Sequence, residues 1–168
     1  MKTISLSQGL HAAVDDADFD WLSQWKWTAE RQDKSTYAMR TARDAAGKYR
    51  NVYMHRELTG APTSHEVDHR NGNGLDNQRG NLRVCTRLQN ARNTGHRCHN
   101  TSGFKGVSKA KRGWVTQVSG RNEVGELRRV RSHHPTKIAA AIEYNIQAIR
   151  HYGEFARLND VFSGEVPL

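Results

Sequence analysis

The stretch from Val67 to Asn90 concentrates residue types that hydrolytic chemistry uses. Asp68 is followed directly by His69, and asparagines stand 12 and 21 residues after that histidine, at Asn81 and Asn90. A carboxylate and a carboxamide are hard oxygen ligands of the kind that Mg²⁺ prefers, and Mn²⁺ accepts the same ligands. We therefore expect Asp68 and Asn90 to form a divalent-metal site.

His69 has the chemistry of a general base. Successive side chains of an extended strand alternate between faces, so His69 should point away from Asp68. A neutral imidazole near pH 7 can take a proton from water while its neighbour holds the metal. Taken singly, an Asp-His pair is typical of a surface loop and asparagines are typical of turns, but their combination favours a catalytic site.

The elements that must position this cluster are short. Residues 60–80 are rich in Gly and Asn and predict a loop around the extended Asp-His segment, followed by a strand over 82–84. Thr86 and Gln89 have the spacing of a capping box, which predicts a helix beginning at Thr86. The positive end of that helix would favour a phosphate close to Asn90.

The first 60 residues predict short strands with a helix between them. Alternation indicates strands at 4–6, 13–14, 37–39 and 52–54, and Asp15 or Asp18 can cap a helix that runs through Leu22. Three tryptophans follow or end this helix. These residues, Trp21, Trp25 and Trp27, are interpreted as core residues, with base-stacking platforms as the alternative. Their acidic neighbours favour the core interpretation.

The C-terminal part predicts a sheet and a helix. Strands are expected at 106–107, 114–118 and 127–131, with turns at 111–113 and 122–125. A helix should open at Pro135 and Thr136, run from Lys137 to Tyr152 and stop at Gly153. Residues 93–102 are rich in Asn, Gly, His and Ser and predict a linker before this unit.

The charge of the chain is unevenly distributed. The formal net charge is +9, divided as +1 over residues 1–64, +3 over 65–100 and +5 over 101–168. The stretch 101–131 alone carries +6. Such a basic stretch favours a polyanionic partner, with an ordinary solvated face as the alternative.

Several classes of protein are excluded by composition. The 168 residues suit one domain or two small ones, and no apolar run approaches the roughly 20 residues of a membrane span. There is no continuous apolar core of a signal peptide, so we expect a cytoplasmic protein. Two cysteines exclude a disulfide framework but leave one mixed zinc site open, with ligands from Cys85, His96, Cys98 and His99.

These motifs resemble the HNH motif of phage and homing endonucleases, which has the ββα-metal fold. The resemblance implies His69 as general base, Asp68 and Asn90 as metal ligands, and Asn81 as the asparagine that ties the loop between two strands. Arg83, Arg87 and Arg92 would then anchor phosphates. The resemblance rests on about 27 residues, Val67-Asp68-His69-Arg70-Asn71-Gly72-Asn73-Gly74-Leu75-Asp76-Asn77-Gln78-Arg79-Gly80-Asn81-Leu82-Arg83 and Thr86-Arg87-Leu88-Gln89-Asn90-Ala91-Arg92-Asn93.

The segment before the motif is similar to the strand-rich lead-in of these endonucleases. Its last residues include His55 and Arg56. These two residues are interpreted either as phosphate contacts near the site or as an ordinary exposed helix end.

The C-terminal segment resembles an AP2-type DNA-binding domain, through Gly103-Phe104-Lys105-Gly106-Val107, Gly113-Trp114, Ala140-Ala141, Tyr144-Asn145, Gly153-Glu154-Phe155-Ala156 and Leu158-Asn159. His134 departs from the Phe that the family usually has there. The resemblance implies a sheet that lies on the DNA major groove. About half of the following candidates should face that groove, because side chains alternate: Lys105, Lys109, Arg112, Trp114, Gln117, Arg121, Arg128 and Arg131.

Together these features predict an α+β chain. An HNH endonuclease domain would span 1–95 (lead-in 1–60, ββα-metal motif 65–95), a linker 96–102, and an AP2-like domain of a three-stranded antiparallel sheet on one helix 103–160. The expected activity is Mg²⁺- or Mn²⁺-dependent cleavage of double-stranded DNA at a preferred sequence, by a monomer or a dimer, as a nick or a double-strand break. The alternatives are a non-catalytic DNA-binding regulator and a zinc-stabilised loop.

Overall fold

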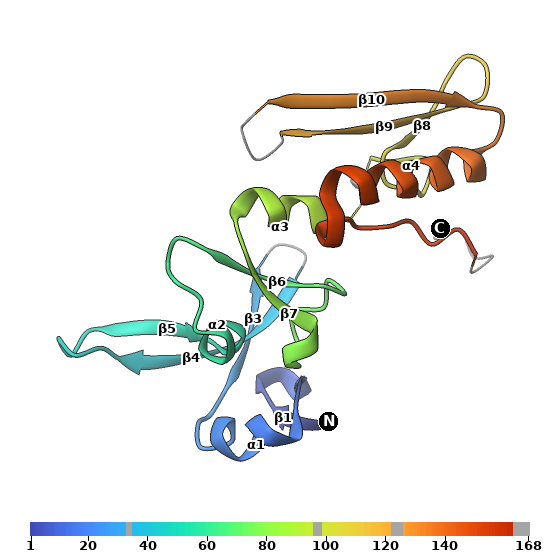
Figure 1. Cartoon of the computed structure of the whole chain (residues 1–168). Coiled ribbons are helices and arrows are strands. Elements are labelled where there is room, and N and C mark those ends of the chain that lie inside the picture. The colour runs from blue at the N-terminus through green and yellow to red at the C-terminus, as the bar shows by residue number, and fades with distance from the viewer. Residues whose placement is uncertain (33–34, 96–98, 122–125, 163–168) are drawn as a thin grey trace. The chain divides into compact units, whose positions relative to one another are not determined.

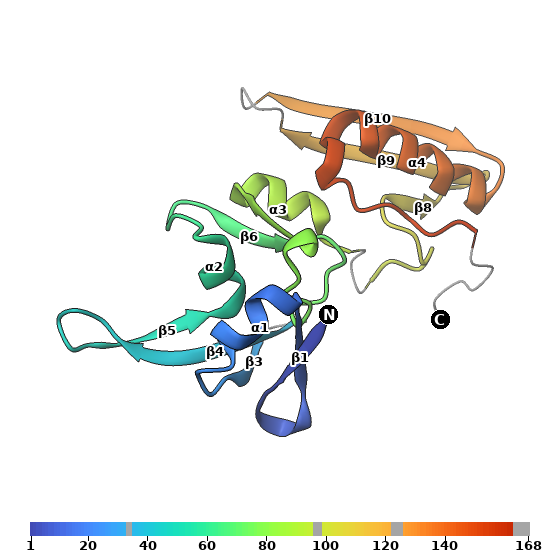
Figure 2. The same ribbon diagram turned by 60° about the horizontal axis from the view of Figure 1, so that its bottom comes forward.

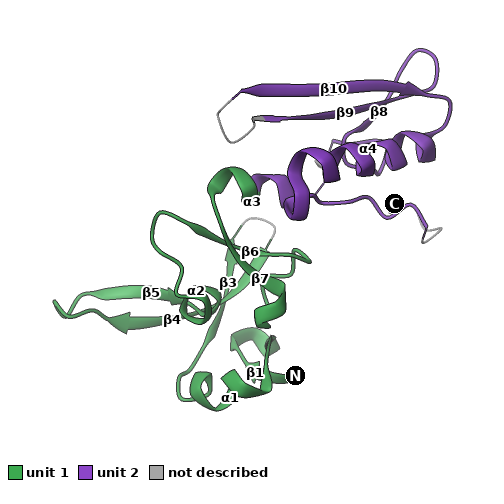
Figure 3. Ribbon diagram, in the orientation of Figure 1, with its two compact units in different colours: residues 1–90 green, residues 91–168 purple. Residues whose placement is uncertain are grey.

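The computed structural model describes residues 1–32, 35–95, 99–121 and 126–162 (Figure 1). The chain divides into two compact units, Met1–Asn90 and Ala91–Leu168 (Figure 3). Both units mix helices with antiparallel strands, so the predicted α+β class is confirmed. No helix among the described residues is both long and apolar enough to cross a membrane.

Unit 1 holds two small hairpins and a three-stranded sheet of order β3-β4-β5, in which β4 and β5 form a long hairpin (Figure 1). Its helices are short. Met54, expected at the end of a strand, is instead the first residue of a helix that follows β5 directly. In chain order the elements are β1 (Lys2–Ser5), η1 (Ser7–Gly9), β2 (His11–Val14), α1 (Asp16–Leu22), β3 (Thr28–Gln32), β4 (Ser35–Arg43), β5 (Tyr49–Tyr53), α2 (Met54–Thr59), β6 (Glu66–His69), η2 (Arg79–Asn81) and β7 (Leu82–Cys85), with α3 (Arg87–Asn93) reaching into unit 2.

The tryptophans belong to the core of unit 1. Trp27 is 3% exposed and donates its indole N–H to the Leu22 carbonyl at 2.8 Å. Trp21 and Trp25 pack against the same core. The Arg40 guanidinium lies over the ring of Trp25, 4.4 Å from its centroid, and is therefore held away from solvent. The core interpretation of the three tryptophans is confirmed.

The predicted capping box is present at the start of α3. The Gln89 backbone N–H donates to Thr86 Oγ1 at 3.3 Å, and the Thr86 N–H donates to Gln89 Oε1 at 2.8 Å. The side-chain cap expected from Asp15 at the start of α1 does not form. Asp15 stands at the N-cap of α1 but makes no side-chain cap bond, because its carboxylate accepts the Arg79 backbone N–H at 2.8 Å instead.

Unit 2 has the predicted sheet with one helix along it. Its elements are β8 (Val107–Lys109), β9 (Trp114–Arg121), β10 (Leu127–His134), α4 (Lys137–Tyr152) and η3 (Gly153–Phe155). The strand order is β10-β9-β8, and α4 lies along one face of the sheet (Figures 1 and 2). Residues 96–98 of the predicted linker and the predicted turn 122–125 lie outside the described residues.

Local chemistry explains both ends of α4. Thr136 Oγ1 accepts the Ala139 N–H at 3.1 Å as the N-cap, and Gly153 takes a positive φ of 55° after the last turn. Apolar side chains of α4 then bury against the sheet. Thr116 in the middle of β9 is fully buried and donates its hydroxyl to the Ala140 carbonyl at 2.5 Å, which fixes the helix on that face.

Gly106 should be irreplaceable for the packing of unit 2. Its φ is +70°, and a Cβ there would overlap the Tyr144 ring and lie 2.8 Å from the Gln117 carbonyl oxygen. Gly106→Ala should destabilise the unit by roughly 2–4 kcal/mol through left-handed backbone strain and overpacking. Thermal unfolding measures this loss. Gly95→Ala is the control, because a Cβ at Gly95 meets nothing within 4 Å, and equal melting temperatures for the two variants would contradict the prediction.

Candidate functional site

Strand β6 separates two kinds of side chain. In the antiparallel register Asp68 pairs with Arg83 and His69 pairs with Leu82. Because side chains alternate, Glu66 and Asp68 share one face of β6 and His69 lies on the other, as the sequence predicted. Both Asp68 and His69 are buried, each 5% exposed. Asp68 and His69 are thus adjacent in sequence, but their side chains lie in different environments on opposite faces of β6.

Asp68 is held by a buried ion pair. Arg83 donates from Nε at 2.8 Å and from Nη2 at 2.5 Å to Asp68 Oδ2. The two side chains are 6% and 7% exposed, so the pair is shielded from solvent. Arg83 was expected to anchor a DNA phosphate, and the structure instead places it in the interior with its guanidinium on this carboxylate.

Asn90 approaches the same face of β6 from α3. Its Nδ2 donates to Glu66 Oε2 at 2.6 Å. Burial, together with the Asp68 and Glu66 carboxylates, raises the pKa of Cys85 to about 11, and Cys85 lies opposite Glu66 in the register. Glu66 was not among the expected site residues, although its position two residues before Asp68 on a strand indicates the shared face.

This oxygen-rich face suits a hard divalent cation. It presents two carboxylates and one carboxamide, and Arg83 balances one of the two negative charges. Over the described ranges, no group of three or more His, Cys, Asp or Glu side chains is arranged to hold a metal ion. A metal site on this face would therefore need the Asn90 amide oxygen in addition to the Asp68 and Glu66 carboxylates, and Asn90 contacts Glu66 through its Nδ2.

His69 lies in a cluster of rings on the opposite face. Its centroid is 5.2 Å from that of His55 and 5.8 Å from that of Tyr37. Burial lowers the pKa of His69, while the Asn77 amide and the Asp68 and Asp76 carboxylates raise it in opposition. The net pKa lies below its ordinary value, so the imidazole is neutral at pH 7 and can accept a proton.

Asn81 closes the loop between β6 and β7. Its Oδ1 accepts the Asn71 backbone N–H at 3.0 Å, and its Nδ2 donates to the Asp76 carbonyl at 2.8 Å. The Arg70 N–H donates to the Asn81 carbonyl at 2.9 Å, directly beyond His69. These bonds hold both ends of the loop, so Asn81 acts on the backbone that carries His69 and Asp76.

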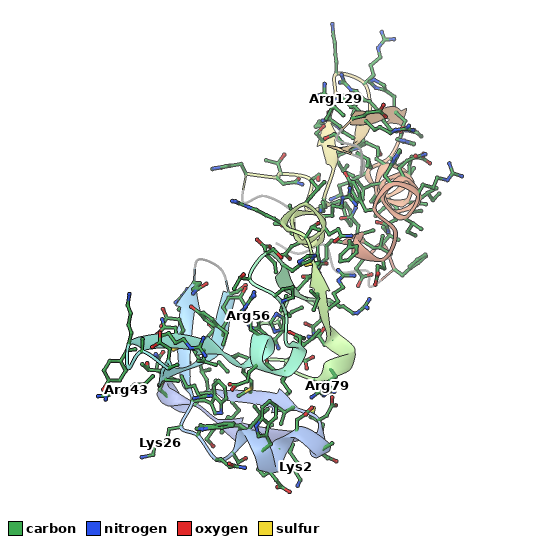
Figure 4. The ribbon with its side chains drawn as sticks, turned by 60° about the vertical axis from the view of Figure 1, so that its left-hand side comes forward. Lys2, Lys26, Arg43, Arg56, Arg79 and Arg129 are labelled. Carbon is green, nitrogen blue, oxygen red and sulfur yellow. The ribbon has the colours of Figure 1, made fainter. Side chains whose placement is uncertain are left out.

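His55 and Arg56 do not form an exposed helix end. His55 is 9% exposed, and Arg56 of α2 donates to the carbonyls of Ala61, Pro62 and His65 at 2.9 to 3.2 Å (Figure 4). Those bonds tie Arg56 to the loop that leads into β6. Arg56 therefore has a structural role, and its phosphate contact stays a prediction.

The family comparison agrees with this geometry. Residues 52–92, from the end of β5 through α3, match the family of HNH endonucleases. This segment is similar to HNH endonucleases. Comparison with curated proteins and with solved structures gives no match. The HNH segment contains the oxygen-rich face, the Asn81 loop, and His55 and His69 of the ring cluster, whereas Tyr37 lies outside it. Enzymes of this family generally use a divalent metal to cleave DNA.

The remaining arginines of the HNH segment lie on α3. Arg87 is exposed, and Arg92 lies over the Tyr152 ring at 5.3 Å from its centroid within unit 2. The mixed zinc site rests partly on His96 and Cys98, which lie outside the described residues. Cys85 is buried, with its thiol 3.7 Å from the Glu66 carbonyl oxygen.

The sheet of unit 2 divides the expected DNA-facing residues between two faces. Thr116 and Val118 face α4, so alternation and cross-strand register put Gln117 of β9 and Arg131 of β10 on the open face. The same register puts three candidates on the helix side: Lys109, Trp114 and Arg128. Arg112 is exposed in the turn before β9, and Arg121 ends β9 with a side chain outside the described part.

Two further basic residues of unit 2 differ from expectation. Arg129, two residues before Arg131, is exposed on the open face of β10 (Figure 4) and was missed, although the same alternation indicates it. Lys105 is not available in the way expected. Its Nζ donates to the Arg92 and Thr94 carbonyls at 2.6 and 2.5 Å, and burial lowers its pKa to about 8.

Removing Arg83 should destabilise unit 1 strongly. Arg83→Ala leaves the Asp68 carboxylate buried without its cation, which costs roughly 3–5 kcal/mol. Adding Asp68→Asn to that variant should recover part of the loss, because the buried charge is then gone. Denaturant unfolding of the parent, the single and the double variants measures both effects, with exposed Arg87→Ala as the control. A double variant no more stable than Arg83→Ala would refute this role of the ion pair.

Proposed function

We propose that the protein is a divalent-metal-dependent endonuclease that hydrolyses phosphodiester bonds of double-stranded DNA at a preferred sequence, as a nick or a double-strand break. The observation that carries this proposal is a neutral, buried His69 on one face of β6 and a carboxylate and carboxamide set on the other, within the segment that matches HNH endonucleases. In this proposal residues 1–95 cleave DNA and residues 103–160 bind it.

The chemistry is an in-line displacement at phosphorus. His69 accepts a proton from water, the water oxygen forms a bond to phosphorus, and the bond to the 3′ oxygen breaks. The leaving oxygen is then protonated from solvent. Asp68 and Asn90, with Glu66 beside them, would hold Mg²⁺ or Mn²⁺, which when bound neutralises charge on the phosphate and the leaving oxygen. Asn81 keeps the loop that follows His69 in place.

The open face of the β8-β9-β10 sheet is proposed to contact the DNA bases. It carries Gln117, Arg129 and Arg131, and arginine to guanine is the commonest specific base contact. Three antiparallel strands with one helix along the other face are consistent with the resemblance to AP2-type domains. Arg87 on α3 is exposed and is the proposed phosphate anchor of the HNH segment.

A non-catalytic DNA-binding regulator is the second candidate. The observation that favours it is the Asp68–Arg83 pair, because a guanidinium on a carboxylate competes with a metal ion for the same oxygens. In that case unit 2 would supply the function and unit 1 would be a scaffold.

Cleavage should depend on His69. With supercoiled plasmid and Mg²⁺ or Mn²⁺, the parent should convert plasmid to nicked or linear DNA, and His69→Ala should be slower by roughly 10²–10⁴-fold because the general base is lost. Gel assays measure the rates, and binding of both proteins to the same DNA in EDTA provides the control. Equal cleavage by His69→Ala rules out the assignment, and DNA binding without any cleavage favours the regulator.

The two faces of the unit 2 sheet should differ in DNA binding. Because the proposal gives these arginines base contacts, Arg129→Ala with Arg131→Ala should lower affinity at the preferred sequence with little change in the slope of log K against log salt. Phosphate contacts would instead reduce the magnitude of that slope by up to about 1.8, since each lost phosphate contact removes about 0.9. Arg128→Ala, on the helix side, is the matched control. An Arg128→Ala variant weaker than the double variant would show that the faces are assigned wrongly.

A further inference from the structure

Four rings from four elements of unit 1, His69 among them, form one cluster. Tyr37 comes from β4, Tyr53 from the end of β5, His55 from the first turn of α2, and His69 from β6. Tyr53 stacks on His55 with centroids 5.6 Å apart and planes at 23°, and Tyr37 lies edge-on to His55 at 5.3 Å. His55 meets His69 at 5.2 Å with planes at 84°. His55 thus contacts each of the other three rings and is the ring nearest to the candidate base.

His55 is an unusual choice for this position if its role is packing alone. The side chain is 9% exposed, and its Nδ1 makes no hydrogen bond to any described residue. A buried polar atom that is left unsatisfied destabilises the folded state, whereas a phenylalanine ring of similar size would carry no such atom. Departures of this kind are expected where a side chain serves a function.

The surroundings keep His55 in one protonation state and one place. Burial lowers the pKa of His55 to about 3, with smaller electrostatic contributions from His69 and Arg56. The ring is therefore a neutral hydrogen-bond acceptor at any working pH. Stacking on Tyr53 limits rotation of the ring, and the Tyr53 hydroxyl is itself held by Gln32 Nε2 at 2.6 Å. A fixed, neutral imidazole nitrogen can accept a hydrogen bond but cannot remove a proton.

The geometry points to His55 as a second catalytic histidine, whose ring nitrogen accepts a hydrogen bond from the attacking water while His69 removes that water's other proton. This inference rests on the proposed nuclease function. A water molecule has two protons, and its lone pair is aimed at phosphorus only when both protons are directed elsewhere. The two imidazole rings lie edge to face with centroids 5.2 Å apart, and in this inference one water molecule lies against a nitrogen of each ring. His69 forms imidazolium, His55 stays neutral, and the water oxygen bonds to phosphorus as the bond to the 3′ oxygen breaks.

The test compares two replacements of His55. His55→Phe keeps a ring against Tyr53 and His69 but removes both nitrogens, and should lower kcat roughly 100-fold with KM unchanged. His55→Asn places an amide atom near the former Nδ1, and should retain kcat within about 10-fold of the parent. Because an unsatisfied nitrogen is removed, the melting temperature of His55→Phe should equal or exceed that of the parent.

The outcomes separate this inference from the proposed function. A parent that does not cleave, or a His69→Ala variant that cleaves like the parent, defeats the nuclease assignment and the inference with it. If the parent cleaves in a His69-dependent way, the inference stands only when His55→Phe loses kcat, His55→Asn regains it, and His55→Phe does not melt earlier. Unchanged kcat in His55→Phe, equal losses in both variants, or a lower melting temperature of His55→Phe each overturn it.

Discussion

The register of β6 against β7 is the constraint on which the candidate site depends. Asp68 pairs with Arg83 across the two strands, and their buried ion pair is available in that register alone. A slip of one residue would turn every side chain of β6 to the opposite face. His69 would then enter the oxygen-rich face and Asp68 would enter the ring cluster. The ion pair and the Asn81 hydrogen bonds therefore keep the proposed base and the proposed metal ligands on different faces of β6.

The N-terminal part of unit 1 supports that register from outside. The Ala13 N–H donates to the Leu75 carbonyl and the Asn77 N–H donates to the Ala13 carbonyl, both at 2.8 Å. Arg79 adds a two-pronged ion pair to Asp18 of α1, with N···O distances of 2.7 and 2.8 Å. The loop between β6 and β7 is thus held at its own ends by Asn81 and along its length by β2 and α1. Two acidic residues of the first segment, Asp15 and Asp18, thus serve this internal pairing with Arg79.

Much of the architecture could be predicted because it depends on local patterns. The capping box at Thr86, the extent of α4 and the opposite faces of Asp68 and His69 follow from spacing and alternation within a few residues. What could not be predicted depends on contacts between distant residues. The Arg83 guanidinium lies on Asp68 because two strands pair, and Lys105 lies on the carbonyls of Arg92 and Thr94 because α3 ends beside it. In both cases the sequence indicates a cation, and only the tertiary structure shows which acceptor it binds: a carboxylate for Arg83 and two backbone carbonyls for Lys105.

Tertiary contacts also decide which basic side chains of unit 2 are available to a partner. A charge counted along the chain is not a charge presented to a partner. Of the basic residues between 101 and 131, Lys105 is bound to backbone carbonyls, and the register places Lys109 and Arg128 on the side of α4. The open face carries Arg129 and Arg131, flanked by neutral Gln117. A few cations on one face of a sheet can hold a polyanion in one orientation. A larger number of cations spread over both faces does so less effectively, because distance and salt weaken the interactions of the far face. The alternation of β10, more than the net charge of the unit, therefore determines where DNA would bind.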